Sequence, residues 1–261
     1  MSYHDYQSNS YRREQDAYEQ ELVFENGFRS FMNRVYNWMG AGLVLTGGVS
    51  YFIYQNMMAS RDEAILAMQT GASVPILWRS STSLILLVLQ LIIVIGLSAA
   101  VNKISAKLAG FCFLVYSILT GITLAPIFLF YSGSTISSAF FVSAGMFAGM
   151  SIFGYMTKAD LSKFGSICVM GLWGFLLATV VNIFWKNSGF DLLLNYLGVA
   201  IFLGITAWDT QRLKMIAAGL DSGEAQSDSM RKYAIIGALQ LYLDFINLFL
   251  LLLKLFGRGR D

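Results

Sequence analysis

The stretch LYLDFINLFLLLLKLF, residues 241–256, places a carboxylate inside an almost wholly apolar run. Asp244 lies 11 residues after Tyr233 and 12 before Phe256. At 1.5 Å per residue, it is about 16–18 Å from either end of a helix over residues 233–256. A charged side chain at that depth in a membrane costs about 2.5–3.5 kcal/mol on insertion scales. We therefore predict that Asp244 lies in a membrane helix and has a function there.

The polar residues of this predicted helix lie on one side. At 100° per residue, they fit within an arc of about 80°. Such a stripe is expected to face the interior of the helix bundle or a wet cavity, and a structural hydrogen-bond seam is the alternative. The stripe consists of Gln240, Asp244, Asn247 and Lys254.

Composition extends the membrane interpretation to nearly the whole chain. The sequence is 56% hydrophobic and 13% charged, with a mean hydropathy of +0.58, whereas soluble domains carry about 25% charged residues. Because a membrane helix needs about 20 mostly apolar residues, we predict an all-α integral membrane protein with seven transmembrane helices. Pro126 predicts a kink in the third. The predicted spans are 35–57, 81–101, 107–130, 136–157, 162–185, 193–215 and 233–256.

The N-terminal segment differs from the rest of the chain. Residues 1–30 are polar, and we predict a disordered cytoplasmic tail followed by one membrane domain over residues 31–261. We expect no signal peptide, because the start lacks a basic region followed directly by an apolar core. Ten Lys and Arg residues flank the spans on the N-terminal side and six on the other. By the positive-inside rule, the N-terminus is cytoplasmic and the C-terminus lies outside.

A second carboxylate, Asp209, lies in AIFLGITAWDTQRLK at residues 200–214. Its position near Arg212 and Lys214 leaves two interpretations open, a solvated carboxylate at a helix end or a buried one. If the last two helices are antiparallel neighbours, Asp209 and Asp244 can meet. Two carboxylates in a low dielectric cannot both ionise freely, so the pair would titrate as a unit. It would also offer oxygen ligands to Ca²⁺.

Several other functions are excluded or disfavoured. The one histidine, His4, lies in the polar N-terminal segment, which argues against a histidine metal site or a Ser-His protease. Cys112 and Cys168 lie in apolar segments and are expected to be buried small hydrophobes rather than a disulfide framework. The net charge of +2, without a basic stripe, does not suggest nucleic acid binding.

Three segments together resemble the Bax inhibitor family, the transmembrane BAX-inhibitor-motif proteins. They are GITLAPIF (121–128), AWDTQ (207–211) and LYLDFINLFLLLLKLFG (241–257). The resemblance covers residues 30–257 and is greatest to bacterial members. It implies a seven-helix fold with the last helix in the centre, in a bacterial inner membrane. It also implies a pH-sensitive Ca²⁺ leak whose sensor is an aspartate pair, matched here by Asp209 and Asp244.

The resemblance implies two supporting contacts. A basic residue near the cytoplasmic end of the second helix contacts the pair, and Lys103 is the matching residue. Where a bacterial member has Arg, Lys cannot pair in a bidentate way. A second contact joins a Glu of helix 2 to a base late in helix 7. Gln90 and Lys254 are the matching residues, and Gln in place of Glu removes the ion pair.

Three functions are weighed. The first is a proton-gated Ca²⁺ leak, in which loss of a shared proton leaves two charges that repel each other or bind Ca²⁺ and open a path. The second is an intramembrane aspartyl protease. LYL precedes Asp244 where that family has Gly-x-Gly, and its Pro-Ala-Leu motif is missing, so we do not expect an enzyme. The third is a regulatory protein that modulates a membrane-bound protease or a cell-death response. No cofactor is expected, and Ca²⁺ would be the transported ion.

Overall fold

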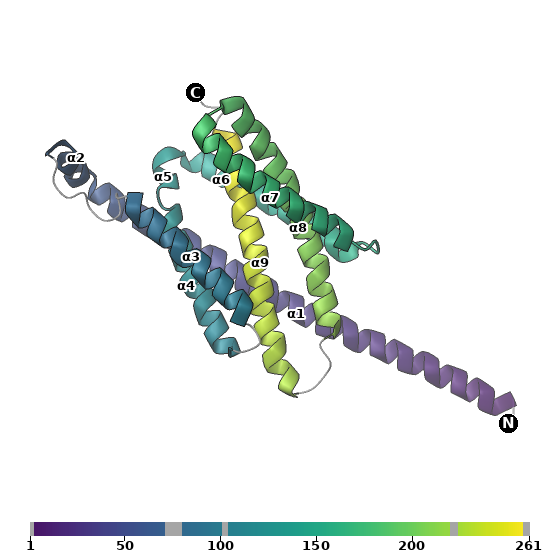
Figure 1. The fold of residues 1–261 in the computed structure, drawn as a ribbon. Helices are drawn as coiled ribbons and strands as arrows, with labels where there is room; N and C mark the ends of the chain where they lie inside the picture. The colour runs from purple at the N-terminus through teal and green to yellow at the C-terminus, as the bar shows by residue number, and fades with distance from the viewer. Residues whose placement is uncertain (1–2, 71–79, 101–103, 220–223, 258–261) are drawn as a thin grey trace.

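The computed structural model describes residues 3–70, 80–100, 104–219 and 224–257, and within these ranges every regular element is a helix (Figure 1). The predicted all-α class is therefore confirmed. The elements are α1 (Tyr3–Ala59), α2 (Arg61–Thr70), α3 (Ser80–Ala100), α4 (Ala106–Leu124), α5 (Ile127–Phe130), α6 (Gly133–Met156), α7 (Ser162–Trp185), α8 (Ser188–Gly219) and α9 (Glu224–Gly257).

The number of membrane spans is only partly as predicted. Five helical segments are long and apolar enough to cross a membrane. The described apolar part of α3, Leu84–Ala100, is shorter than these. The first predicted span lies in α1, where glycines and polar residues such as Asn37 alternate with the apolar ones. Seven spans are therefore not confirmed. The five are Ala106–Phe130, Gly133–Met156, Ser162–Trp185, Ser188–Ala218 and Ser229–Gly257.

The segment predicted to be a disordered tail is the N-terminal part of α1, which begins at Tyr3. Figure 1 shows this part of the helix extending away from the other helices. Among the buried side chains of α1 are Phe28 and Phe31, which belong to the main hydrophobic core. The division of the chain at residue 30 stays a prediction.

The predicted kink at Pro126 is confirmed. Helix α4 ends at Leu124, and the short helix α5 begins at Ile127, directly after the proline. Proline has no backbone N–H and clashes with the preceding turn, so it ends the regular hydrogen-bond ladder. The Ala125 N–H instead donates to the Ile122 carbonyl at 3.3 Å, in a tighter turn.

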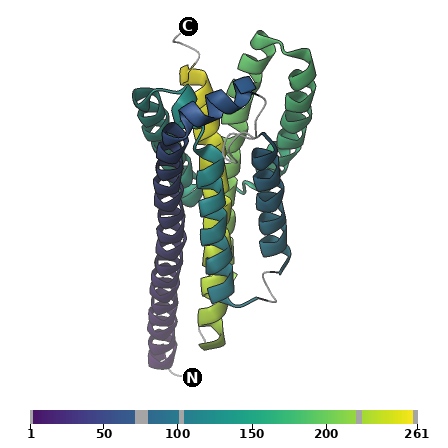
Figure 2. The same cartoon turned by 90° about the vertical axis from the view of Figure 1, so that its left-hand side faces the viewer.

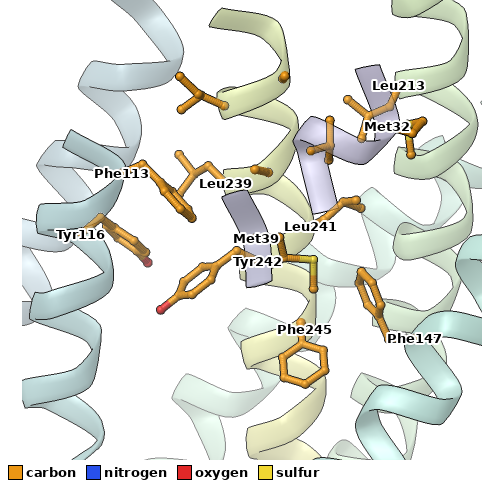
Figure 3. Packing of buried hydrophobic residues seen from close by; sticks show 14 of the residues in the cluster. Met32, Met39, Phe113, Tyr116, Phe147, Leu213, Leu239, Leu241, Tyr242 and Phe245 are labelled. Carbon is orange, nitrogen blue, oxygen red and sulfur yellow. The ribbon is translucent and has the colours of Figure 1, made fainter. Parts of the chain in front are cut away.

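Helix α9 lies between two groups of helices (Figures 1 and 2). It contacts α1 and α4 on one side and α6 and α8 on the other, while α3 packs on α4 and α7 packs on α8. Among the five candidate spans, α9 is the most buried. Its side chains form much of the hydrophobic core, where Tyr242 and Phe245 pack against rings from α4 and α6 (Figure 3). This arrangement buries both faces of the helix that carries Asp244.

Candidate functional site

The structure brings the two predicted aspartates together at the interface of α8 and α9. The side chains of Asp209 and Asp244 are joined by a hydrogen bond. Both residues are buried, with 6% and 5% of their surface exposed. Helix α8 continues past Gln211 to Gly219, so Asp209 lies within the helix and not at its end. The interpretation of Asp209 as a solvated carboxylate at a helix end is therefore wrong.

The chemistry of this contact is set by its donors and acceptors. An ionised carboxylate only accepts hydrogen bonds, so a bond between two carboxyl groups requires one proton between them. The remaining oxygen of Asp244, Oδ2, is buried and has no hydrogen-bond partner among the described residues. Buried polar atoms without a partner are rare and costly. The hydrogen bond between the two carboxyl groups therefore exists only while at least one of them is protonated.

A positive charge lies beside the pair on α8. Arg212, three residues after Asp209, acts on that carboxyl electrostatically. The Arg212 guanidinium also sits 5.6 Å from the ring centroid of Trp208, in a cation–π contact, and its side chain is exposed. Residues three apart lie on the same side of a helix. Arg212 is therefore an exposed cation close enough to the buried pair to act on the Asp209 carboxyl group.

The three residues that the resemblance matched to supporting contacts are Lys103, Gln90 and Lys254. Lys103 lies outside the described residues, so its contact with the pair stays a prediction. Gln90 of α3 donates through Nε2 to the Thr123 hydroxyl of α4 at 2.6 Å. Lys254 is exposed in the last turn of α9. Within the described part of the chain, no hydrogen bond or ion pair joins Gln90 to Lys254.

Asn247 and Gln240 also belong to the polar stripe on α9. The Asn247 amide donates through Nδ2 to the backbone carbonyl of Leu243 in its own helix at 2.9 Å. Asn247 is half-buried, as is Gln240. Neither residue has a described contact with the pair. Cys112 is half-buried and Cys168 is buried, and both are free thiols.

Two polar contacts near the site were not predicted from the sequence. Gln211, two residues after Asp209, is buried and hydrogen-bonded to the segment between α6 and α7. On α9, the Tyr242 hydroxyl meets the Thr46 hydroxyl at 2.7 Å. Gln211 belongs to the AWDTQ stretch, but the hydrogen-bond partners of its side chain are backbone groups about fifty positions away in sequence. No local pattern identifies such partners.

The pair is a poor resident metal site. Ca²⁺ takes 6–8 oxygen ligands, and two carboxylates provide about four. In the described residues, no group of three or more His, Cys, Asp or Glu side chains surrounds a possible ion position.

Comparisons with known proteins agree with the resemblance seen in the sequence. The family model described as "Inhibitor of apoptosis-promoting Bax1" matches residues 28–261. The "Inner membrane protein YbhL" of Escherichia coli strain K12 is 43% identical over 235 residues, covering 90% of this chain and 94% of that protein. A protein of Borreliella burgdorferi is 37% identical, covering 93% and 96%. One of Caulobacter vibrioides is 36% identical, covering 97% and 98%.

Proposed function

The chain belongs to the Bax inhibitor family, and we propose that it is a pH-sensitive Ca²⁺ leak channel gated by the Asp209–Asp244 pair. It is a multi-pass inner-membrane protein, as the apolar helices and the similarity to the Escherichia coli protein support. Under this proposal Ca²⁺ is the transported ion, no cofactor takes part, and the protein is not an enzyme. The N-terminus is on the cytoplasmic side.

The observation that carries the proposal is the contact between two buried carboxyl groups from different helices. A carboxyl group within a membrane helix is expensive, and it is usually found where ions or protons are handled. Here two such carboxyl groups are buried together, and Asp244 Oδ2 has no hydrogen-bond partner among the described residues. A purely structural seam would be expected to satisfy every buried oxygen.

The proton count of the pair would control the interface of α8 and α9. With one shared proton, the hydrogen bond holds the two helices together. When that proton leaves, the bond is lost and two like charges face each other in a low dielectric. The contact therefore weakens as pH rises, and the freed carboxylates are ligands of the kind that Ca²⁺ prefers. This couples the packing of α9, the most buried candidate span, to pH.

Flux measurements test the proposal. The full-length protein is reconstituted in liposomes that contain a Ca²⁺-sensitive dye, and Ca²⁺ entry is recorded over a range of pH. We expect a pH-dependent flux in the wild type. In Asp209→Asn and Asp244→Asn, the amide keeps a hydrogen bond across the interface but cannot ionise, so the flux should no longer respond to pH.

A matched control is Asn247→Leu, which changes a polar residue on the same helix whose described hydrogen bond stays within α9. This variant should keep the pH response of the wild type. The proposal is contradicted if both aspartate variants retain the flux and the pH profile of the wild type.

A further inference from the structure

Gln211 joins α8 to the segment that connects α6 and α7. Its Oε1 accepts a hydrogen bond from the Leu161 N–H at 2.8 Å, and its Nε2 donates to the Ala159 carbonyl at 2.8 Å. The side chain is 8% exposed. A carboxamide offers a donor and an acceptor from one planar group. Both functions of Gln211 are used on the same short segment.

The connecting segment depends on this contact at the start of α7. Leu161 is the N-cap residue of α7, and its side chain makes no capping hydrogen bond. The first N–H groups of a helix have no partner within the helix. Close by, Ser162 N–H donates to Asp160 Oδ1 at 2.9 Å. Gln211 therefore supplies, from another helix, an acceptor that the start of α7 lacks.

Other contacts tie the same part of α8 to α6 and α7. A Cβ atom on Gly154 of α6 would overlap the Ala207 carbonyl, and one on Gly165 of α7 would overlap the Trp208 indole. These backbones approach each other because both positions are glycine. One turn beyond Gln211, the Lys214 ammonium donates to the Tyr155 carbonyl at 3.1 Å.

The periodicity of α8 turns these contacts into a constraint on Asp209. Residues two apart on an α-helix point about 200° apart. Gln211 points toward the segment between α6 and α7, whereas Asp209 points toward Asp244 of α9. Fixing the first side chain to that segment fixes the rotation of α8, and with it the direction of the Asp209 carboxyl group.

We propose that Gln211 is a positioning residue for the carboxylate pair: it joins α6, α7 and α8 into one body that moves against α9 when the pair separates. This inference rests on the proposed function and names a residue that sets how the pair responds to pH. Gln211 itself does not touch the ion or the pair.

The titratable and charged groups around this part of α8 come from every element packed on it. Only Arg212 and Asp244 act on Asp209 directly among the described residues. Tyr36 lies beside Thr210, and Lys214 reaches Tyr155. Among the described residues, these groups are Tyr36 of α1, Tyr155 of α6, Lys158 and Asp160 of the connecting segment, Lys163 of α7, Arg212 and Lys214 of α8, and Asp244 of α9.

Two variants of the full-length protein test the inference. Gln211→Leu keeps the volume and removes both hydrogen bonds. Gln211→Glu can replace both while its carboxyl group is protonated, but an ionised carboxylate has no hydrogen for the Ala159 carbonyl. Gln55→Leu is the control, since the Gln55 amide bonds only to Tyr51 on its own helix.

The first measurement is the rate of backbone amide hydrogen exchange in the peptide that contains Leu161, which does not depend on Ca²⁺ flux. We expect exchange about fivefold to tenfold faster in Gln211→Leu than in the wild type, from the loss of hydrogen bonds of ordinary strength. Gln211→Glu should match the wild type at low pH. As pH rises it should lose only the bond to the Ala159 carbonyl and keep Leu161 protected, because an ionised carboxylate still accepts from the Leu161 N–H. Gln55→Leu should match the wild type throughout.

Ca²⁺ flux in liposomes is then recorded over pH for the same proteins. A shifted pH profile in Gln211→Leu, with Gln211→Glu close to the wild type only at low pH, supports the role. If Gln211→Leu does not fold, Gln211→Glu carries the same test, because a residue that only fills space would show no such pH signature.

The two possible failures are distinguishable. A wild-type protein whose flux does not depend on pH overturns the proposed function, and the role of Gln211 with it. A pH-dependent wild-type flux that both Gln211 variants leave unchanged overturns the role of Gln211 alone, even when the exchange of Leu161 becomes faster.

Discussion

Helix α9 makes two buried polar contacts only two residues apart, and they differ in how completely they are satisfied. On the side of α1 and α4, the Thr46 hydroxyl donates to the Ser117 carbonyl at 3.0 Å. The Tyr242 hydroxyl therefore donates to Thr46 at 2.7 Å. On the side of α8, Asp244 meets Asp209 but keeps a buried oxygen without a partner.

Under the proposed function, the Tyr242 contact is structural and the Asp244 contact is the one that responds to protons. Both contacts bury polar atoms in a membrane helix, so burial alone does not distinguish them. The Tyr242 contact uses neutral groups whose donors and acceptors match at any ordinary pH. The Asp244 contact is complete only when it holds a proton. Under the proposed function, a change of pH acts on the Asp244 side of α9 and leaves the Tyr242 side packed.

The largest loss of stability is expected for Thr46→Val. This change removes the hydroxyl that serves both neighbours, so the Ser117 carbonyl and the Tyr242 hydroxyl lose a partner together. The Tyr242 hydroxyl still has the Thr120 and Ser117 side chains as hydrogen-bond partners, so the expected cost is that of the lost bonds, about 0.5–1.5 kcal/mol each. Thermal unfolding in detergent should show a clear decrease in Tm, with the pH dependence of Ca²⁺ flux unchanged. An altered pH dependence would mean that the two sides of α9 are not independent.

Asp209→Asn is expected to change stability little and its pH dependence clearly, the opposite of Thr46→Val. The amide can donate to Asp244 without a shared proton, so the contact survives and stability at low pH should change by about 1 kcal/mol or less. The measurement is the Tm in detergent as a function of pH. The wild type should lose stability as pH rises and the pair loses its proton, whereas the variant should lose less. Parallel Tm profiles for the two proteins would contradict this expectation.

Tyr242→Phe removes one hydroxyl from the satisfied side and is expected to have a smaller effect than Thr46→Val. Thr46 still donates to Ser117, so no donor is left without a partner. Hydrogen bonds between membrane helices are worth about 0.6 kcal/mol on average. Unfolding of the two variants side by side tests the ranking. If Tyr242→Phe loses as much stability as Thr46→Val does, the stabilisation depends on the Tyr242 hydroxyl rather than on Thr46.

The smallest effect is expected for Asp160→Asn, outside the membrane helices. The pKa of the Asp160 carboxyl is lowered, chiefly by a hydrogen bond from the Ser162 side chain and also by the Ser162 backbone. A lowered pKa in the folded state means stabilisation that is present above the ordinary aspartate range and is lost as pH falls through the folded value. The variant should therefore differ slightly from the wild type at neutral pH and not at all in acid. A difference that grows in acid would contradict the assignment.

The fold class and the importance of Asp244 could be predicted from local signals, whereas the pairing of Asp209 with Asp244 was implied by the family resemblance. Apolar runs of membrane length indicate helices, and Asp244 is costly enough in its run to indicate a function. The burial of Asp209 was left open, since it depends on how far α8 continues. The Gln211 contact and the Thr46–Tyr242 contact could not be predicted, because their partners come from helices distant in sequence. The count of seven spans was not confirmed, and glycines and polar residues dilute the apolar signal in α1.

Infrared spectroscopy tests most directly whether Asp209 and Asp244 share a proton. The carbonyl stretch of a protonated carboxyl group is followed as pH is raised, in the wild type and in the Asp209→Asn/Asp244→Asn double variant. We predict a band in the wild type that disappears over the pH range in which Ca²⁺ flux changes, and that the double variant lacks. A wild type without this band, or a double variant that retains it, would contradict the account.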